Sequence, residues 1–146
     1  MRRFLVVANQ TLAGHHLLKH VRERLAAGPC WFFVLVPATP IDAQLVPGDG
    51  EADVLARRRL EGALARFRAE GASAVGAVGD PNPLRAITEA LRQESFDEIV
   101  LSTLPPGTSR WLMDDLPTRL ARATRLPVTH LVSEGQLSTE STALRA

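Results

Sequence analysis

Two groups of small polar side chains follow apolar segments of this 146-residue chain, and their chemistry suits an anion or a polar small molecule. Asn9 and Thr11 follow the first apolar run. A later run, Ile99–Leu101, is followed by hydroxyl groups and one guanidinium: Ser102, Thr103, Thr108, Ser109 and Arg110. Hydroxyl and guanidinium groups donate hydrogen bonds, and a guanidinium can pair with carboxylate or phosphate through two bonds. These residues are the candidate ligand site.

The same residues also have a local interpretation that involves no ligand. Thr11 and Ser109 would cap helices. Ser102 and Thr103 would bond strand-end backbone groups, and Arg110 would be a surface cation. Both interpretations stay open at the level of the sequence.

The elements that must position these residues follow from the apolar pattern. Compact apolar runs predict strands at Phe4–Ala8, Trp31–Val36, Glu98–Ser102 and Val128–Val132. A weaker run of mixed small residues, Ala72–Val78, predicts a strand at the edge of the sheet. Helical spacing lies between them, in segments that end near Ala27, Glu70, Glu94 and Thr124. This alternation predicts an α/β fold: a single-domain, five-stranded parallel sheet with helices on both faces. We expect the sheet to be doubly wound, with the strand order 3-2-1-4-5. In that order the loops after strands one and four diverge, and the crevice between them is the expected ligand site.

Bulk composition narrows the class of protein. Residues 1–133 are expected to form one α/β domain, and residues 134–146 a polar, frayed tail. The net charge of +1 gives no general attraction for nucleic acid, and no apolar segment approaches the length of about 18 residues that spans a membrane. Cys30 is the single cysteine, so no internal disulfide can form, which fits a reducing cytoplasm.

Other clusters of reactive side chains favour structural interpretations. His15, His16 and His20 have spacing that can hold a metal, but a solvated helix face is favoured and no metal site is predicted. The basic residues Arg57, Arg58 and Arg59 indicate a solvated face or, alternatively, a surface for an acidic partner. Trp111 is expected to pack, with a lid as the alternative. No nucleophile elbow, P-loop or dinucleotide motif is present, so we expect no enzyme activity, with nucleotide hydrolysis as the weaker alternative.

Three short stretches resemble the universal stress protein family. These are the turn Gly79-Asp80-Pro81, the entry to the fourth strand at Phe96–Val100, and Leu126-Pro127-Val128 before the last strand. In this order and spacing they make residues 3–132 similar to that family. The resemblance implies the α/β fold already expected, and nucleotide-binding members of the family carry a G-x2-G-x9-G-[S/T] motif after the fourth strand.

The sequence departs from that motif. Ser102-Thr103 stands where the family usually has Gly-Thr, and Ala8-Asn9 replaces an acidic residue common after the first strand. Prolines without N–H groups follow, and two carboxylates stand near the expected Gly-Ser: Pro105, Pro106, Asp114 and Asp115. The two aspartates are expected to cap the helix that begins at Leu116. One phosphate–carboxylate contact at about 4 Å and a dielectric constant near 20 costs on the order of 4 kcal/mol. We therefore expect no cofactor, and weak or absent binding of ATP or AMP by this route.

The resemblance also implies a homodimer, since the family commonly dimerises through its last strand. Here the dimer edge would be Val128, His130 and Val132. The expected function is that of a cytoplasmic, homodimeric regulatory or binding protein of the universal-stress type. The alternative is a nucleotide- or anion-dependent stress regulator with its ligand in the crevice, where Thr108–Arg110 would form a small anion site at a helix start.

Overall fold

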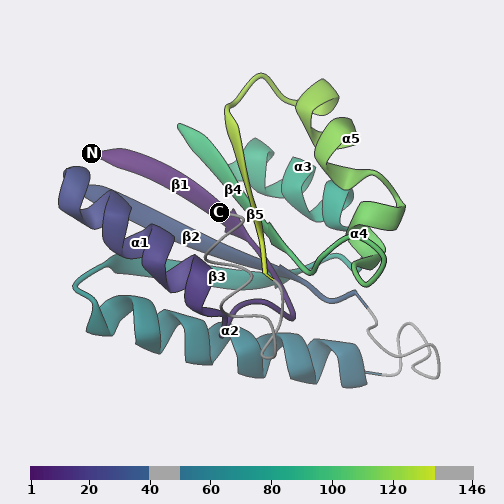
Figure 1. Cartoon of the computed structure of the whole chain (residues 1–146), viewed down its shortest axis with the longest axis horizontal. Helices are drawn as coiled ribbons and strands as arrows, with labels where there is room; N and C mark the ends of the chain where they lie inside the picture. The colour runs from purple at the N-terminus through teal and green to yellow at the C-terminus, as the bar shows by residue number, and fades with distance from the viewer. Residues whose placement is uncertain (40–49, 134–146) are drawn as a thin grey trace.

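The computed structural model describes residues 1–39 and 50–133, apart from the side chain of Arg110; the predicted tail, 134–146, lies outside them. A five-stranded parallel sheet has the order β3-β2-β1-β4-β5, which confirms the predicted topology (Figure 1). The strands are β1 (Arg2–Val7), β2 (Cys30–Pro37), β3 (Ser73–Gly79), β4 (Glu98–Thr103) and β5 (Val128–Val132). The helices are α1 (His15–Ala27), α2 (Glu51–Ala69), α3 (Pro83–Gln93), α4 (Arg110–Met113) and α5 (Leu116–Ala123).

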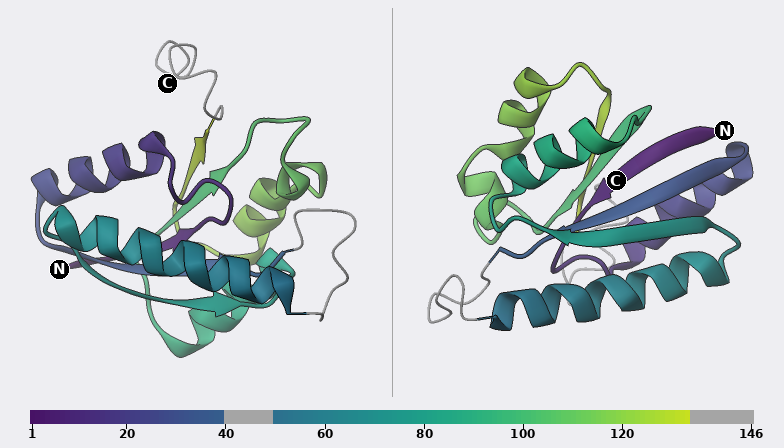
Figure 2. Two further views of the ribbon diagram at one scale, coloured as in Figure 1. Left: turned by 90° about the horizontal axis from the view of Figure 1, so that it is seen from below. Right: turned by 180° about the vertical axis from the view of Figure 1, so that it is seen from behind.

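Helices cover both faces of the sheet, with α1 and α2 on one side and α3, α4 and α5 on the other (Figures 1 and 2). Under α1 and α2, the rings of Phe4 and Phe32 stack at 5.4 Å and Phe67 of α2 meets Phe32 edge-on at 5.8 Å. Under α3–α5, Leu5 and Ile87 are buried in a second apolar cluster. Burial on both faces explains why the central strands are continuous apolar runs.

Two helix starts differ from the expectation. Helix α1 begins at His15, with Gly14 as its N-cap, because Thr11 and Gly14 close a turn first through a 2.9 Å backbone bond. Thr11 is therefore not a cap. The predicted helical segment ending near Thr124 is divided into α4 and α5, since Asp115 adopts a left-handed conformation with φ of 56°.

Helix α2 packs closely on β3, which is one of the two edge strands of the sheet. A Cβ on Gly76 of β3 would collide with the backbone carbonyl oxygen of Val34 on β2 and would lie 2.6 Å from Leu60 Cδ1 of α2, so glycine is required at this position. β3 lies at the edge of the sheet, as its weak apolar character predicted. No helix in the described ranges is long and apolar enough to cross a membrane.

Candidate functional site

The loops after β1 and β4 meet at the carboxyl-terminal edge of the sheet. Thr11 Oγ1 lies 2.6 Å from Ser102 Oγ, and both residues are buried. The topology predicted this meeting, and the structure brings the two residues together. Their hydroxyl groups bond each other, so each has less capacity left for a ligand.

Asn9 connects three elements at the same edge. Its Nδ2 donates to the carbonyl oxygen of Pro37 at 2.7 Å, and its Oδ1 accepts from Arg59 Nη1 at 2.7 Å. Arg59 is half-buried, and burial lowers its pKa from the ordinary value. Of the three arginines expected on one basic surface, Arg57 and Arg58 are exposed, whereas Arg59 is directed to the end of β1.

The sequence did not lead us to expect that arginines of α2 bond the loop between β1 and α1. Arg66, seven residues after Arg59, donates to the carbonyl oxygen of Leu12 at 3.3 Å. Both arginines therefore hold the β1–α1 loop from one face of α2. The available signal was their position beside buried residues of the same helix, Leu60 and Phe67.

Thr103 is bonded across to the last strand. Its Oγ1 lies 2.8 Å from Nε2 of His130, and Thr103 is buried while His130 is exposed overall. Burial of the ring lowers the pKa of His130 below its usual 6.5. Thr103 thus has a protein partner on β5.

The backbone N–H groups of the loop before α4 donate hydrogen bonds within the loop itself. The backbone N–H groups of Thr108 and Ser109 both donate to the carbonyl oxygen of Pro105, at 3.1 and 3.0 Å. Ser109 Oγ accepts from the N–H of Leu112 at 3.2 Å, which confirms the predicted helix cap. The Ser109 side chain is also buried. Thr108 is exposed, and the side chain of Arg110 lies outside the described part of the structure. Loop amides that bond a proline carbonyl are not directed at a ligand.

The expected capping role of Asp114 and Asp115 is wrong. Asp115 occupies the N-cap of α5, but its side chain makes no capping hydrogen bond. The left-handed backbone turns the carboxylate away from the next amides, and Pro117 removes one of them. Both aspartates are exposed.

Trp111 joins loops that are distant in sequence. Its indole Nε1 donates to Thr39 Oγ1 at 3.2 Å, and Thr39 Oγ1 donates to the carbonyl oxygen of Pro81 at 2.6 Å. The side chain is 8% exposed and belongs to the apolar cluster under α3–α5. Trp111 therefore packs, as expected.

A buried carboxylate at the opposite end of the sheet was also missed. Glu98 is 4% exposed and accepts from Arg24 Nη2 at 2.8 Å, Arg2 Nη2 at 3.2 Å and Thr129 Oγ1 at 2.7 Å. Arg24 Nε also donates to His20 Nε2 at 3.3 Å, and burial, together with Arg24, lowers the pKa of His20. A glutamate that begins an otherwise apolar strand was the signal for this network.

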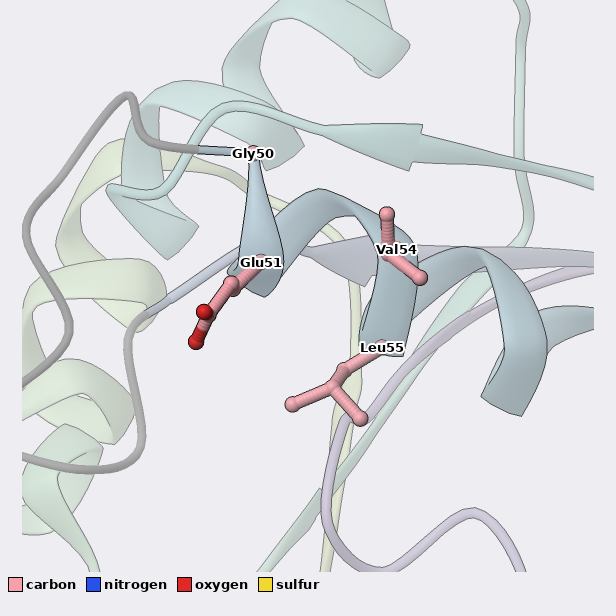
Figure 3. A pocket seen from close by; sticks show the side chains of 4 residues that line it. All are labelled: Gly50, Glu51, Val54 and Leu55. Carbon is pink, nitrogen blue, oxygen red and sulfur yellow. The ribbon is translucent and has the colours of Figure 1, made fainter.

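Figure 3 shows a pocket of about 460 Å³ at the start of α2. Gly50, Glu51, Val54 and Leu55 line it among the described residues. A second pocket, of about 370 Å³, lies between α3 and the strands β2 and β3, with Phe33 and Leu35 in its wall. Among the predicted site residues whose side chains the structure describes, none lines either pocket.

Of three comparisons with known proteins, the one with solved structures found similar proteins. Family models and curated proteins yield no match. A solved universal stress protein from Arabidopsis thaliana, with AMP bound, has a TM-score of 0.66 and 11% identity over 98% of this chain and 99% of that one. One from Archaeoglobus fulgidus, in complex with dAMP, has a TM-score of 0.58 and 16% identity over 89% and 96%. A family member from Burkholderia pseudomallei has a TM-score of 0.60 and 18% identity over 88% and 94%. These structures confirm the resemblance inferred from the sequence, and the chain has the fold of the universal stress protein family.

Proposed function

We propose that this protein is a non-catalytic, cytoplasmic binding protein that acts as a homodimer joined through β5 and does not bind ATP through a phosphate-binding loop. The observation that carries the homodimer is a difference between the two edges of the sheet. Both β3 and β5 are edge strands, but only β3 has a backbone group covered by a side chain among the described residues.

Two hydrogen bonds indicate which backbone groups of β5 point toward β4 and which point away from the sheet. The Ile99 N–H donates to the carbonyl oxygen of Pro127 at 2.9 Å. Six residues after Pro127, the Ser133 N–H donates to β4 at 2.8 Å. Backbone groups alternate in direction along a parallel strand, so the N–H and C=O groups that point outward belong to Val128, His130 and Val132. These are the residues expected at the dimer edge.

The β3 edge is protected by a guanidinium. Arg68 donates from Nε and Nη2 to the carbonyl oxygen of Ala74, at 3.1 and 2.8 Å. A covered carbonyl cannot accept from an incoming strand, which is one way that proteins protect sheet edges. No described side chain bonds the outward backbone groups of β5, so β5 is the edge available for a second copy.

The absence of an ATP loop is supported by the bonds around Pro105. A phosphate cradle needs several free backbone N–H groups that converge on one point. Here Pro105 and Pro106 supply none, and the amides of Thr108 and Ser109 bond the Pro105 carbonyl. The exposed carboxylate of Asp114 would add repulsion nearby.

Light scattering after size exclusion at micromolar concentration tests the homodimer. Val132→Lys places a charge on the β5 edge, and Val75→Lys is the matched control on the β3 edge. We expect the wild type and V75K to be dimers and V132K to be a folded monomer by circular dichroism. A monomeric wild type, or dissociation of V75K alone, contradicts the proposal. Calorimetry with Mg²⁺ and ATP tests the second part, which a micromolar Kd would refute.

A second candidate function is a nucleotide- or anion-dependent stress regulator. It is supported by the AMP and dAMP complexes of proteins with the same fold and by the meeting of the β1 and β4 ends at one edge of the sheet. A thermal-shift panel with ATP, AMP, cyclic AMP and sulfate tests it. Stabilisation that is lost in Thr11→Val, but retained in the exposed control Thr118→Val, would favour this candidate; no shift with any of them would exclude it.

A further inference from the structure

A small pocket of about 140 Å³ lies where the ends of β2 and β3 meet α3, α4 and α5. Leu84, Trp111 and Leu116 form its apolar wall, and Asp114 and Arg119 place one carboxylate and one guanidinium in its lining. Described residues of several elements line the pocket. It is independent of the proposed dimer edge.

The two charged groups are the polar groups of the pocket that have no protein partner. In the described part of the chain, neither Asp114 nor Arg119 forms a side-chain hydrogen bond or an ion pair, and they do not pair with each other. By contrast, the Thr39 hydroxyl bonds Trp111 and Pro81. Likewise, the oxygen of the Asn82 side chain caps α3.

We propose that this pocket binds a small α-amino acid as its zwitterion. The ligand carboxylate pairs with Arg119, the ammonium group pairs with Asp114, and a small side chain packs on the apolar wall. A guanidinium recognises a carboxylate through two parallel bonds. A simple anion would be repelled by Asp114 and a simple cation by Arg119, so the pair selects a ligand with both charges.

The size of the pocket limits the ligand. A volume of about 140 Å³ is small for a ligand pocket. We therefore expect the pocket to favour a small amino acid such as glycine, alanine or serine over a nucleotide. Ordinary pockets for larger ligands have about 300–1,000 Å³.

Trp111 supplies a direct readout. The chain has two tryptophans, so Trp31→Phe leaves Trp111 as the single indole fluorophore. Because its indole N–H donates to Thr39 at the pocket, a ligand there should change its emission. A thermal-shift titration of the otherwise unaltered protein provides a second measurement if W31F does not fold.

The experiment titrates L-alanine against alaninamide, which lacks the carboxylate, and N-acetylalanine, which lacks the ammonium group. We expect saturable binding of L-alanine and glycine, and binding of both analogues at least about tenfold weaker, since each loses a charge-assisted bond. Arg119→Gln and Asp114→Asn should weaken alanine binding by a similar factor. Arg122→Gln, a control on α5 outside the pocket lining, should leave it unchanged.

Several results would overturn the proposal. These are no saturable response to L-alanine or glycine in either measurement, equal responses to alanine and its two analogues, an equal response to phenylalanine, or equal losses in R122Q and R119Q. None of them bears on dimerisation or on ATP.

Discussion

Replacing Glu98 by glutamine should destabilise the protein and weaken the attachment of β5. The carboxylate is the point where four elements meet: Arg2 of β1, Arg24 of α1 and Thr129 of β5 all donate to it on β4. Glutamine has nearly the same volume, so no cavity forms. The substitution removes the negative charge and one of the two acceptor oxygens.

The magnitude follows from burial and from the number of bonds. The Glu98 side chain is 6% exposed, Arg24 is 27% exposed and Arg2 is 54% exposed. Removing one partner of a fully buried pair costs about 3–5 kcal/mol, and a bond to a charged group contributes about 1.5–3 kcal/mol. Because both guanidinium groups retain contact with water, we expect the lower part of this range, about 2–3 kcal/mol. At about 2–4 °C per kcal/mol for a chain near this size, the Tm should fall by roughly 4–12 °C.

Urea unfolding followed by circular dichroism measures this cost. Arg2→Gln removes the more exposed bond and should cost less than about 1 kcal/mol. Thr129→Val removes only the link to β5 and should cost about 1 kcal/mol. All variants must be compared at one protein concentration, because dimerisation would add to the apparent stability. The reasoning is refuted if E98Q is as stable as the wild type or if R2Q costs as much as E98Q.

Three further predictions concern the fold and its pH dependence. Asn82→Ala removes the side-chain cap of α3 and should cost about 1 kcal/mol in urea unfolding, while N82D retains the acceptor. Gly76→Ala forces the new methyl group against the Val34 carbonyl oxygen and Leu60 and should cost about 1–3 kcal/mol, seen as a lower Tm. Burial lowers the pKa of His20 and His130 below 6.5 in the folded state, so the unfolded chain binds protons first as the pH falls. Stability should therefore decline below about pH 6.5, and the double variant H20Q/H130Q should show a flatter dependence of Tm on pH.

The strands could be predicted because burial on both faces requires unbroken apolar runs such as Phe4–Ala8. The strict alternation of strands and helices predicted that these strands are parallel, and the order is a common one for doubly wound sheets. The start of α1 was harder to predict, because Thr11 has the chemistry of a cap and only the distant Ser102 gives it another partner. A local rule cannot include a contact between residues 91 positions apart.

The sequence predicted where the candidate site lies, but not which side chains bond one another there. Topology brings the ends of β1 and β4 together, so Thr11 and Ser102 could be named from the sequence. The choice of partners depends on side chains from other elements. Arg59 illustrates this point, because its neighbours Arg57 and Arg58 are exposed and only the helical phase directs it toward Asn9.

The proline loop explains how the crevice can keep its shape without a phosphate. In a glycine loop, converging amides require an anion to balance them. Here the carbonyl of Pro105 accepts from both Thr108 and Ser109, and Gly107 takes the positive φ of 89° that closes the turn. A Pro105→Gly change alone would keep that carbonyl in place, so it should not create ATP binding. A gain of micromolar ATP affinity in P105G would mean that the missing N–H group, and not the occupied amides, prevents binding.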